Sequence, residues 1–412
     1  MAHLREAAVQ ERAPAVTAPR VEDATPRHLA PFLCLADFEA AARRRLPRQI
    51  YGYYAGAAET CQSFQANAAS FRSYELVPRV LADVSARSAR TTLFGTTYDA
   101  PFGIAPMGLS GLATFEGELV LARAATQAGI PAIVSATSLM PLERVATQGG
   151  ARWFQAYLPG EDARIEAMVD RVEAAGYDTF VLTADVPVPA NRENNVRTGF
   201  SIPLQPSLRL LWDGLSRPHW LGATWLATFL RHGVPHFENM DAFRGPPILS
   251  RHVVRAIGAR DQLSWRHLEL IRRRWPGRLI LKGVLSAEDA VQAREHGADG
   301  VIVSNHGGRQ LDGARPALAA LPAIAEVAGP MRVMVDGGIR RGSDVLKALA
   351  LGAHFVFVGR PFLFAAAARG QDGVRHAIRL LLAEIERDMA LLGVTRIEAL
   401  TRAHVERAPW AA

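Results

Sequence analysis

Lysine and cysteine are scarce in this 412-residue sequence. Of its 47 lysine and arginine residues only Lys282 and Lys347 are lysines, so arginine provides nearly all of the positive charge. The two cysteines, Cys34 and Cys61, lack the spacing of metal ligands and cannot build a disulfide framework in so long a chain. We therefore expect no metal site and a reducing compartment, the cytoplasm.

Three further features are missing. No apolar run approaches the roughly twenty residues that a membrane-spanning helix needs. Residues 1–30 are rich in Ala, Pro, Arg and Glu but lack the apolar stretch of a signal peptide, which predicts a flexible tail before one domain at 31–412. The net charge of +7 comes from arginines that are scattered without interleaved aromatics, so nucleic acid is not an expected partner.

What the sequence does contain is an alternation of short apolar runs with helical patterns. The eight runs are residues 102–105, 132–135, 153–157, 180–185, 279–282, 300–304, 333–336 and 355–358. No Gly-x-Gly-x-x-Gly opens a helix after the first run, which argues against a nicotinamide-binding Rossmann fold. The alternation predicts an α/β fold, a closed (β/α)8 TIM barrel. An amphipathic helix from Leu35, interrupted at Pro47, predicts an N-terminal helical cap over one end of the barrel.

Polar side chains stand at or near the carboxyl ends of the predicted strands. Because these ends converge on one mouth of a parallel barrel, we expect the side chains to meet there and form an active site. They are Ser135, Gln155, Tyr157, Thr183, Asp185, Lys282, Ser304, His306 and Asp336.

The segment 304–312 places His306 and Arg309 just beyond the sixth strand. An imidazole can accept a proton near neutral pH, and a guanidinium can hold a carboxylate through two parallel hydrogen bonds. The pair therefore suits proton removal from a carboxylate-bearing substrate. The alternative is a glycine-rich turn that contains a histidine of the core.

Glycines and arginines follow the last two strands. Barrels commonly build a phosphate cradle from these two turns, so we expect a phosphate-bearing cofactor. Lys282 ends the fifth strand, where its ammonium could stabilise negative charge on the pyrimidine edge of a reduced flavin; a Schiff-base lysine and a structural ion pair are the alternatives. The residues of the two turns are Asp336, Gly337, Gly338 and Arg340 after the seventh strand, and Gly359 and Arg360 after the eighth.

From about residue 36 to 410 the chain resembles the FMN-dependent L-2-hydroxy acid oxidases and dehydrogenases. Besides the motifs above, the phrases Ala-Pro-Met-Gly-Leu-Ser-Gly at 105–111 and Arg-His-Gly-Val-Pro at 231–235 are similar to the membrane-associated mandelate and L-lactate dehydrogenase branch. The resemblance implies FMN as cofactor and oxidation of a small L-2-hydroxy acid, lactate- or mandelate-like, to the 2-oxo acid. It also implies electron transfer to a quinone or another acceptor, and a homo-tetramer.

The resemblance further implies a role for each matching residue. His306 would be the catalytic base, and Asp185 would orient its imidazole. The substrate would be bound by Tyr53, Tyr157, Arg192 and Arg309. FMN would be bound by Pro106, Met107, Gly108, Ser135, Gln155, Thr183, Lys282, Ser304, Asp336, Gly337, Gly338, Arg340, Gly359 and Arg360.

Three positions refine these expectations. Residues 193–195 read Glu-Asn-Asn, where relatives often carry an acidic residue near the end of the stretch, so the ion pairing of this loop is open. Thr137 lies near the place of a large aromatic in glycolate oxidase-like relatives, which predicts room for a larger substrate. Gly108 lies where dehydrogenases often carry glycine and oxygen-using relatives alanine. The alternatives to a dehydrogenase are a hydrogen-peroxide-producing oxidase, a barrel lyase that uses Lys282, and a flavin-binding barrel without turnover.

A long insertion, residues 201–263, follows the fourth strand. It mixes arginines with the aromatic residues Trp212, Trp220, Trp225, Phe229 and Phe237. Such a mixture is typical of a helix that lies in a membrane interface. The alternative is a lid whose aromatics pack on the barrel or on a neighbouring subunit. Resemblance to the membrane-associated branch favours peripheral attachment to the inner face of the cell membrane.

Overall fold

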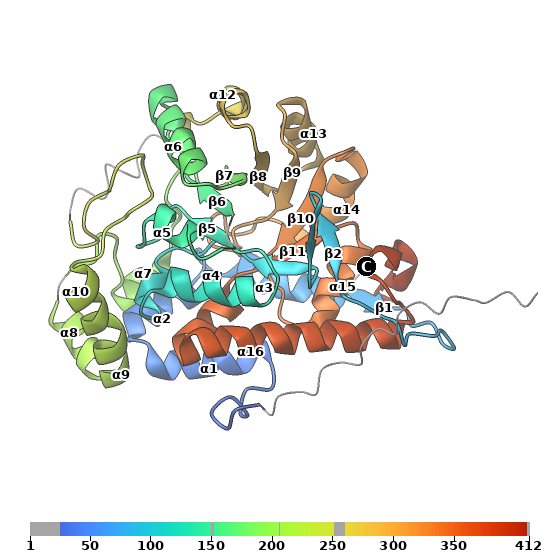
Figure 1. Ribbon diagram of the computed structural model, residues 1–412, viewed down its shortest axis with the longest axis horizontal. Coiled ribbons are helices and arrows are strands. Elements are labelled where there is room, and N and C mark those ends of the chain that lie inside the picture. Colours follow the sequence, from blue (N-terminus) through green and yellow to red (C-terminus); the bar gives the residue numbers. More distant parts are fainter. Residues whose placement is uncertain (1–24, 150–151, 206, 251–259, 410–412) are drawn as a thin grey trace, which may run out of the picture.

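A ring of eight parallel strands forms the centre of the molecule (Figure 1). The computed structural model describes residues 25–149, 152–205, 207–250 and 260–409. The strands are β4 (Phe102–Ile104), β5 (Ile133–Ser135), β6 (Trp153–Ala156), β7 (Thr179–Thr183), β8 (Arg278–Val284), β9 (Gly300–Val303), β10 (Arg332–Asp336) and β11 (Phe355–Val358). They pair in the order β4-β11-β10-β9-β8-β7-β6-β5, and a parallel bridge between Ile104 and Ala132 closes the ring. The predicted (β/α)8 TIM barrel is confirmed.

Side chains alternate between the inside of the barrel and its outer face, because successive residues of a strand point in opposite directions. In six strands, an apolar residue of the inner plug is followed two positions later by a polar residue at the mouth. The residue between them is apolar and packs in the outer core. This period of two gathers the polar set at one end of the barrel. The six pairs are Ile133 and Ser135, Trp153 and Gln155, Val181 and Thr183, Ile280 and Lys282, Ile302 and Ser304, and Met334 and Asp336.

A hairpin of β2 (Thr91–Leu93) and β3 (Thr96–Tyr98) covers the opposite end of the inner plug. Leu93 is buried in the plug, and Phe94 and Tyr98 pack against it. The centroids of the Phe94 and Trp153 rings are 6.0 Å apart. The hairpin therefore separates the apolar end of the barrel from solvent.

Helices surround the barrel in the expected alternation. One of them, α16, kinks at Arg369 and Gly370, whose backbone is not helical. Strand β12 (Val405–Arg407) pairs with β1 (Tyr74–Leu76) and ties the C-terminal segment to the N-terminal one. The helices are α4 (Gly117–Gln127), α5 (Leu142–Ala146), α6 (Asp162–Ala174), α12 (Trp265–Arg274), α13 (Ala287–Glu295), α14 (Ala317–Val327), α15 (Gly342–Ala350) and α16 (Arg360–Leu392).

An N-terminal helical segment reaches the mouth of the barrel, as predicted. α1 (Leu35–Arg45) packs against α16, and Pro47 separates it from α2 (Arg48–Ala55), which α3 (Gln62–Ser70) follows. The hydroxyl of Tyr54 in α2 donates a hydrogen bond to Leu109 O at 2.6 Å, in the loop after β4. Of the predicted tail, residues 1–24 lie outside the described residues, whereas Leu29 is buried.

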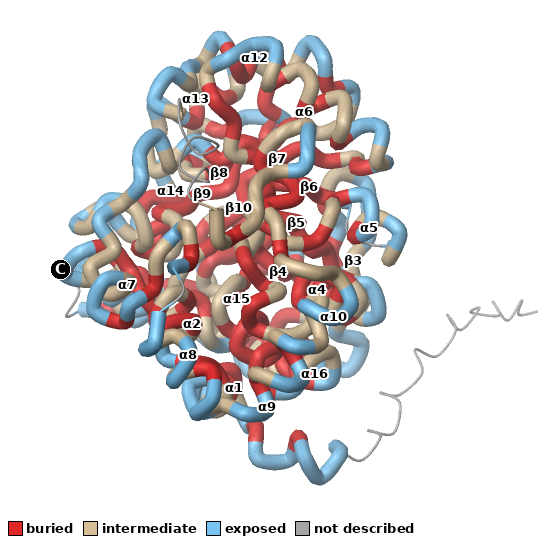
Figure 2. Tube along the Cα trace, turned by 90° about the vertical axis from the view of Figure 1, so that its left-hand side faces the viewer, coloured by how far each residue is buried: buried red, intermediate tan, exposed pale blue. Residues whose placement is uncertain are grey.

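The insertion, which follows α7 (Glu193–Thr198), has two unlike halves. The first half consists of α8 (Leu208–Leu215) and a continuous helical run of α9 (Pro218–Trp220), η3 (Leu221–Leu226) and α10 (Ala227–His232). Figures 1 and 2 place α8 and α9 at one end of the molecule, beside α1 and α16. The aromatic residues of the insertion divide: Trp212 and Phe229 are exposed, Trp225 is half-buried, and Trp220 and Phe237 are buried.

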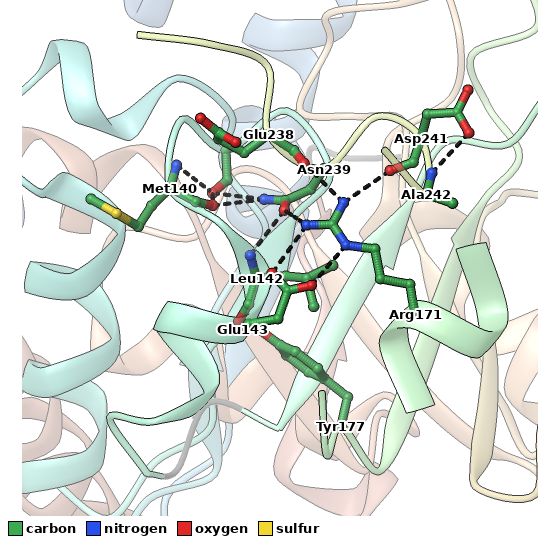
Figure 3. Close-up of polar contacts among 10 residues, drawn as sticks. Met140, Leu142, Glu143, Arg171, Tyr177, Glu238, Asn239, Asp241 and Ala242 are labelled. Atoms are coloured by element: carbon green, nitrogen blue, oxygen red, sulfur yellow. Dashed lines mark hydrogen bonds and ion pairs between the residues drawn. The ribbon is translucent and has the colours of Figure 1, made fainter. Parts of the chain in front are cut away.

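The second half, residues 233–250, returns over the barrel as a loop that hydrogen bonds hold in place (Figure 3). Arg171 of α6 donates to the carbonyl oxygens of Glu238 and Asp241 at 2.9 and 3.0 Å. The buried side chain of Asn239 accepts a hydrogen bond from Leu142 N at 2.9 Å. This anchored loop forms part of the wall of the cavity described next, and residues 251–259 of the insertion lie outside the described residues.

Candidate active site

A cavity of about 870 Å³ opens at the mouth of the barrel, a volume typical of ligand sites. Its wall includes α2, the loops after β4, β7, β9, β10 and β11, and the anchored loop of the insertion. Of the predicted site residues, all but Ser135, Gln155, Asp185 and Ser304 line it. Those four belong to the hydrogen-bonded layer behind the lining, where Ser135, Asp185 and Ser304 contact lining residues directly.

His306 lies between Asp185 and Tyr157. Its Nδ1 is 2.9 Å from Asp185 Oδ1, and its Nε2 is 3.3 Å from the Tyr157 hydroxyl. Because a carboxylate accepts hydrogen bonds, Nδ1 carries the proton and Nε2 keeps a lone pair. The backbone of His306 is left-handed, with φ +57°, and its N–H donates to Ser304 Oγ at 3.0 Å, which fixes the turn.

Burial and charge set the protonation of this group. Burial lowers the pKa of His306 more than the Asp185 carboxylate raises it, so the imidazole is neutral and can accept a proton. Burial acts to raise the pKa of Asp185, but its interaction with His306, which includes a hydrogen bond, and the positive charge of Lys282 outweigh burial and lower that pKa. Burial raises the pKa of Tyr157 to about 12, so its hydroxyl stays protonated. A base, the anion that orients it and a neutral donor are thus in contact.

Arg192 and Arg309 add positive charge to the same cavity. Arg309 Nη1 donates to the carbonyl oxygens of Tyr53 and Gly56 at 2.8 and 2.6 Å, and Arg192 Nε donates to Arg309 O at 3.1 Å. Neither guanidinium pairs with a carboxylate of the described residues. Burial, with the charge of Arg192, lowers the pKa of Arg309 to about 10. Two such guanidinium groups beside a base suit an anionic ligand, and the planar fork matches a carboxylate.

Arg340 and Arg360 form a second positive group at the turns after β10 and β11. Arg360 Nη2 donates to Gly307 O at 2.7 Å. Burial, together with neighbouring arginines, holds the pKa of Arg360 well below its ordinary value, and burial also lowers the pKa of Arg340. Gly338 has φ +83°, and a Cβ there would lie 2.4 Å from Asn67 O, so the turn needs glycine. These turns can hold a phosphate.

Lys282 of β8 lines the same cavity. Its Nζ donates to Ser304 Oγ at 2.7 Å and lies 3.1 Å from Asp336 Oδ2. Burial acts to lower its pKa, but the Asp336 and Asp185 carboxylates outweigh burial and raise it. The ammonium therefore stays charged, which suits electrostatic stabilisation better than nucleophilic attack.

Buried polar atoms without a partner mark the space for a ligand. Ten buried side-chain nitrogen or oxygen atoms of the described residues have no hydrogen-bond partner. Buried polar groups are nearly always satisfied, so a bound molecule with its own donors and acceptors fits this place. A flavin ring, a ribityl chain and a phosphate provide both. Five of the ten atoms belong to the predicted site: Gln155 Nε2, Thr183 Oγ1, Asp185 Oδ2, Asp336 Oδ1 and Arg360 Nε.

Arg260 is a cavity residue that the sequence reasoning missed. It lies on η4 (Arg260–Gln262), and its guanidinium carbon is 4.6 Å from the centroid of the Tyr157 ring. Burial lowers its pKa. No motif surrounds it in the sequence, since it enters the site from the far end of the insertion. Arg260 therefore adds a third guanidinium group, besides those of Arg192 and Arg309, to the part of the cavity that contains His306.

Gly108 and Thr137 are in close contact on the cavity wall. A Cβ on Gly108 would lie 1.9 Å from Thr137 Oγ1, which itself contacts Ser135 Oγ at 3.0 Å. A larger residue at position 108 would therefore require Thr137 to move. The two positions that the resemblance connects with the acceptor and the substrate are structurally coupled.

A barrel mouth with a neutral histidine, unpaired arginines and a cationic cradle for phosphate defines a flavin-dependent oxidoreductase. The chain belongs to the FMN-dependent dehydrogenase family, which matches residues 42–407, and its cofactor is FMN. It is 39% identical over 371 residues to the L-lactate dehydrogenase of Stenotrophomonas maltophilia (strain R551-3), a match that covers 89% of this chain and 96% of that protein. It is also 39% identical over 367 residues to the (S)-mandelate dehydrogenase of Pseudomonas putida, covering 89% of this chain and 91% of the relative.

Solved structures show the same likeness. The monotopic membrane protein (S)-mandelate dehydrogenase superposes with a TM-score of 0.85 at 37% identity, covering 92% of this chain and 100% of that one. A mandelate oxidase superposes with a TM-score of 0.75 at 36% identity, covering 91% and 98%. Dehydrogenases and oxidases are therefore both similar to this chain. Across the described residues, no helix has the length and apolar character to cross a membrane.

Proposed function

We propose that the protein oxidises a small L-2-hydroxy acid, lactate- or mandelate-like, to the 2-oxo acid. The observation that carries the proposal is the neutral His306, held at 2.9 Å by Asp185, in one cavity with the unpaired Arg192 and Arg309. The L-lactate and (S)-mandelate dehydrogenases to which the chain is similar support this substrate class.

The arginines and tyrosines position the substrate. Arg309 uses Nη1 for backbone carbonyl oxygens, which leaves its other N–H groups for a carboxylate, and Arg192 adds a second cation. Tyr157, protonated and in contact with His306, can donate to a substrate oxygen, and Tyr53 lines the same wall. A carboxylate held there directs the neighbouring C2 toward the imidazole.

His306 then accepts a proton at Nε2. Oxidation removes two electrons and two protons from C2 and its hydroxyl group, and His306 can accept one of the protons whether the hydroxyl proton or the α proton leaves first. Asp185, 2.9 Å from Nδ1, stabilises the imidazolium that forms. Bound FMN would accept the two electrons together with the second proton.

The remaining polar residues of the mouth would hold FMN. Lys282, charged and paired with Asp336, would stabilise negative charge on the ring, and Gln155 and Thr183 would satisfy their free polar atoms there. The phosphate would lie on the glycine turns with Arg340 and Arg360. Behind the cavity lining, Ser135 and Ser304 form hydrogen bonds with Thr137 and Lys282, which would support the side chains that hold FMN. The wall after β4, formed by Pro106, Met107 and Gly108, and the turn residues Gly337, Gly338 and Gly359 complete the set.

The electron acceptor would be a quinone or another molecule outside the protein. Gly108 and the dehydrogenase relatives favour this over direct use of oxygen. A hydrogen-peroxide-producing oxidase is the second candidate, because a mandelate oxidase is also similar to the chain. A lyase that uses Lys282 as a Schiff base is disfavoured, because the raised pKa keeps that ammonium protonated.

Peripheral attachment to the cell membrane, on its cytoplasmic face, is part of the proposal. α8 exposes an apolar stripe with the helical spacing i, i+3, i+4 and i+7, a face that a membrane interface would cover. The half of the insertion that includes it, residues 207–233, contains three arginines and a single acidic residue. Assembly as a homo-tetramer stays a prediction from resemblance. The stripe consists of Leu208, Leu211, Trp212 and Leu215, and α10 with the end of η3 adds Leu226, Phe229 and Leu230.

The proposal is tested by anaerobic mixing of the purified flavoprotein with glycolate, L-lactate and (S)-mandelate. We expect the flavin that the purified protein releases to be FMN. At least one of the larger acids should bleach the bound flavin, and a soluble quinone should reoxidise it faster than oxygen does. Bleaching by none of the acids would contradict the substrate class. Hydrogen peroxide formed at the rate of turnover would instead identify an oxidase.

A further inference from the structure

A second cavity, of about 460 Å³, lies outside the barrel between α1, α9 and the kink of α16. Figures 1 and 2 show α9 of the insertion beside α1 and α16, the helices that contribute most of the other lining residues. We name it the cationic groove. Its lining includes Phe32, Ala40, Arg44, Arg45, His219 and Arg369.

The groove is preformed by contacts between the insertion and the body of the protein. Arg45 Nη1 donates to Ala368 O at 3.0 Å, and Arg45 Nη2 lies 2.7 Å from His219 Nε2 on α9. Arg217, just before α9, donates to Leu46 O at 3.2 Å. The first turn of the insertion's helical run is therefore fixed against α1.

The groove has a net positive charge, because Arg44, Arg45 and Arg369 outnumber the single acidic residue among the described lining residues. No ion pair with a carboxylate involves Arg44, Arg45 or Arg369 within the described residues. The acidic residue among the lining residues, Asp37, accepts hydrogen bonds from Leu33 N and Cys34 N at 2.8 and 3.0 Å. Its carboxylate is thus engaged at the beginning of α1, and the arginines are left for an external anion.

The surroundings narrow the identity of that anion. The arginines are exposed or half-exposed at the rim, and small residues, Ala40, Ala41 and Ala368, leave space between them. The apolar stripe of α8 ends at Leu215, three residues before α9 begins. A molecule with a phosphate on a short polar stem and an apolar tail matches this arrangement.

We infer that the cationic groove binds the phosphate of an anionic phospholipid while α8 and α10 lie in the same membrane surface. The inference rests on the proposed membrane attachment. Arginine forms strong, forked hydrogen bonds with phosphate, and basic residues near a membrane surface attract anionic lipid. The groove would fix the orientation of the protein, since the lipid is held at one defined point beside the apolar helices.

The test compares two substitutions on α1 that add the same charge. Ala40→Glu places a carboxylate in the groove, and Ala36→Glu places one on the exposed surface one turn earlier, outside the lining. Glutamate is a good helix former, so both variants should fold and retain FMN. With vesicles of phosphatidylcholine and phosphatidylglycerol, we expect Ala40→Glu to weaken binding about tenfold and Ala36→Glu less than about twofold.

A second matched pair of variants removes a positive charge instead of adding a negative one. Arg44 lines the groove, whereas its neighbour Arg43 does not, and both are exposed. Arg44→Gln should weaken vesicle binding about fivefold, and Arg43→Gln about twofold or less. Equal effects within both pairs would overturn the groove as a lipid site.

Two other outcomes are distinguishable. If the unmodified protein binds no vesicles, the proposed membrane attachment fails, and the inference fails with it. If inorganic phosphate, at constant ionic strength, raises the melting temperature of the flavoprotein but not of Ala40→Glu, while both glutamate variants bind vesicles equally, the ligand is a soluble phosphate and the lipid assignment is overturned.

Discussion

The mouth of the barrel and the helical half of the insertion both contain arginines and aromatic residues, but these side chains differ in their exposure to solvent. At the mouth, the arginines are half-buried, and the Arg309 guanidinium carbon lies 5.0 Å from the centroid of the Tyr53 ring. In the insertion, the aromatic side chains of Trp212 and Phe229 are 71% and 50% exposed. Composition alone does not separate the two regions, whereas burial does.

The difference has an energetic meaning. The arginines of the mouth are half-buried and have no carboxylate partner among the described residues, so each should interact strongly with an anionic ligand that enters the cavity. An exposed arginine or leucine costs little in water and contributes to binding only in sum with its neighbours. We therefore expect single substitutions at the mouth to slow flavin reduction. In the insertion, only combined substitutions should weaken vesicle binding strongly.

The largest effect is expected for His306→Gln. Glutamine has no basic lone pair of comparable strength, so anaerobic flavin reduction should slow by about a hundredfold to ten-thousandfold. FMN content and vesicle binding should stay the same, because the substitution lies at the mouth. Stopped-flow absorbance measures the rate. Reduction at the unmodified rate would remove His306 from the mechanism.

Next in size is the loss of the apolar stripe of α8. Replacing Leu211, Trp212 and Leu215 together by serine should weaken vesicle binding at least a hundredfold, since each buried side chain contributes about 1.5–3 kcal/mol. Flavin reduction should not change. The matched control replaces Val80, Leu81 and Leu391, which are exposed outside the insertion, and should leave sedimentation with vesicles unaffected. Equal loss in both triple variants would contradict a specific membrane face.

Arg309→Lys is a more conservative substitution at the mouth and tests the binding of the substrate carboxylate. The charge remains, but the fork that serves both backbone carbonyl oxygens and substrate carboxylate is lost. We expect kcat/KM to fall about tenfold to a hundredfold, as for loss of a charged hydrogen bond. Steady-state kinetics with an artificial acceptor measures it. Unchanged kinetics would assign the carboxylate to Arg192 or Arg260.

Asn239→Ala tests the boundary between the two regions. It leaves the buried N–H of Leu142 without its partner and removes one of the two side-chain donors to the carbonyl of Met140, the other being Ser138 Oγ (Figure 3). The free energy of unfolding should fall by about 1–3 kcal/mol. Chemical denaturation measures this, and Gln65→Ala, at an exposed amide, should change it by less than about 0.5 kcal/mol. Equal stability of both variants would show that the loop is not held by Asn239.

The smallest effect concerns pH. Burial lowers the pKa of His306, so the free imidazole persists below the usual histidine value near 6.5. As the pH falls from neutral, the rate of flavin reduction should stay constant down to that value and decline only below it, where the base becomes protonated. A pH profile of single-turnover reduction measures this. A decline that begins above pH 7 would contradict the lowered pKa.

Much of the mouth could be predicted because a strand has a period of two. Once the strands are placed, an apolar residue such as Trp153 or Met334 fixes the direction of the residue two positions later, and Gln155 and Asp336 follow. The loop after Arg192 was less predictable. Residues 193–198 form α7, where Glu193 pairs with Arg197 at 2.6 Å, an interaction within one helix turn.

The insertion could be predicted less well, because its contacts are distant in sequence. Trp220 is buried and its indole N–H donates to Leu112 O at 2.8 Å, whereas the side chain of Trp212 is exposed. Only tertiary structure distinguishes the two. Arg260 enters the cavity for the same reason. The spacing of Leu208, Leu211, Trp212 and Leu215 was the one local signal of an exposed stripe.

The central claim is that the residues at the mouth of the barrel oxidise the substrate and that the insertion attaches the protein to the membrane. Its most direct test is the rate of anaerobic flavin reduction by L-lactate or (S)-mandelate, measured with the protein free in solution and bound to vesicles. We predict rapid reduction by the L enantiomer at the same rate in both states. Absence of reduction in both states, or reduction only on the vesicle, would contradict the claim.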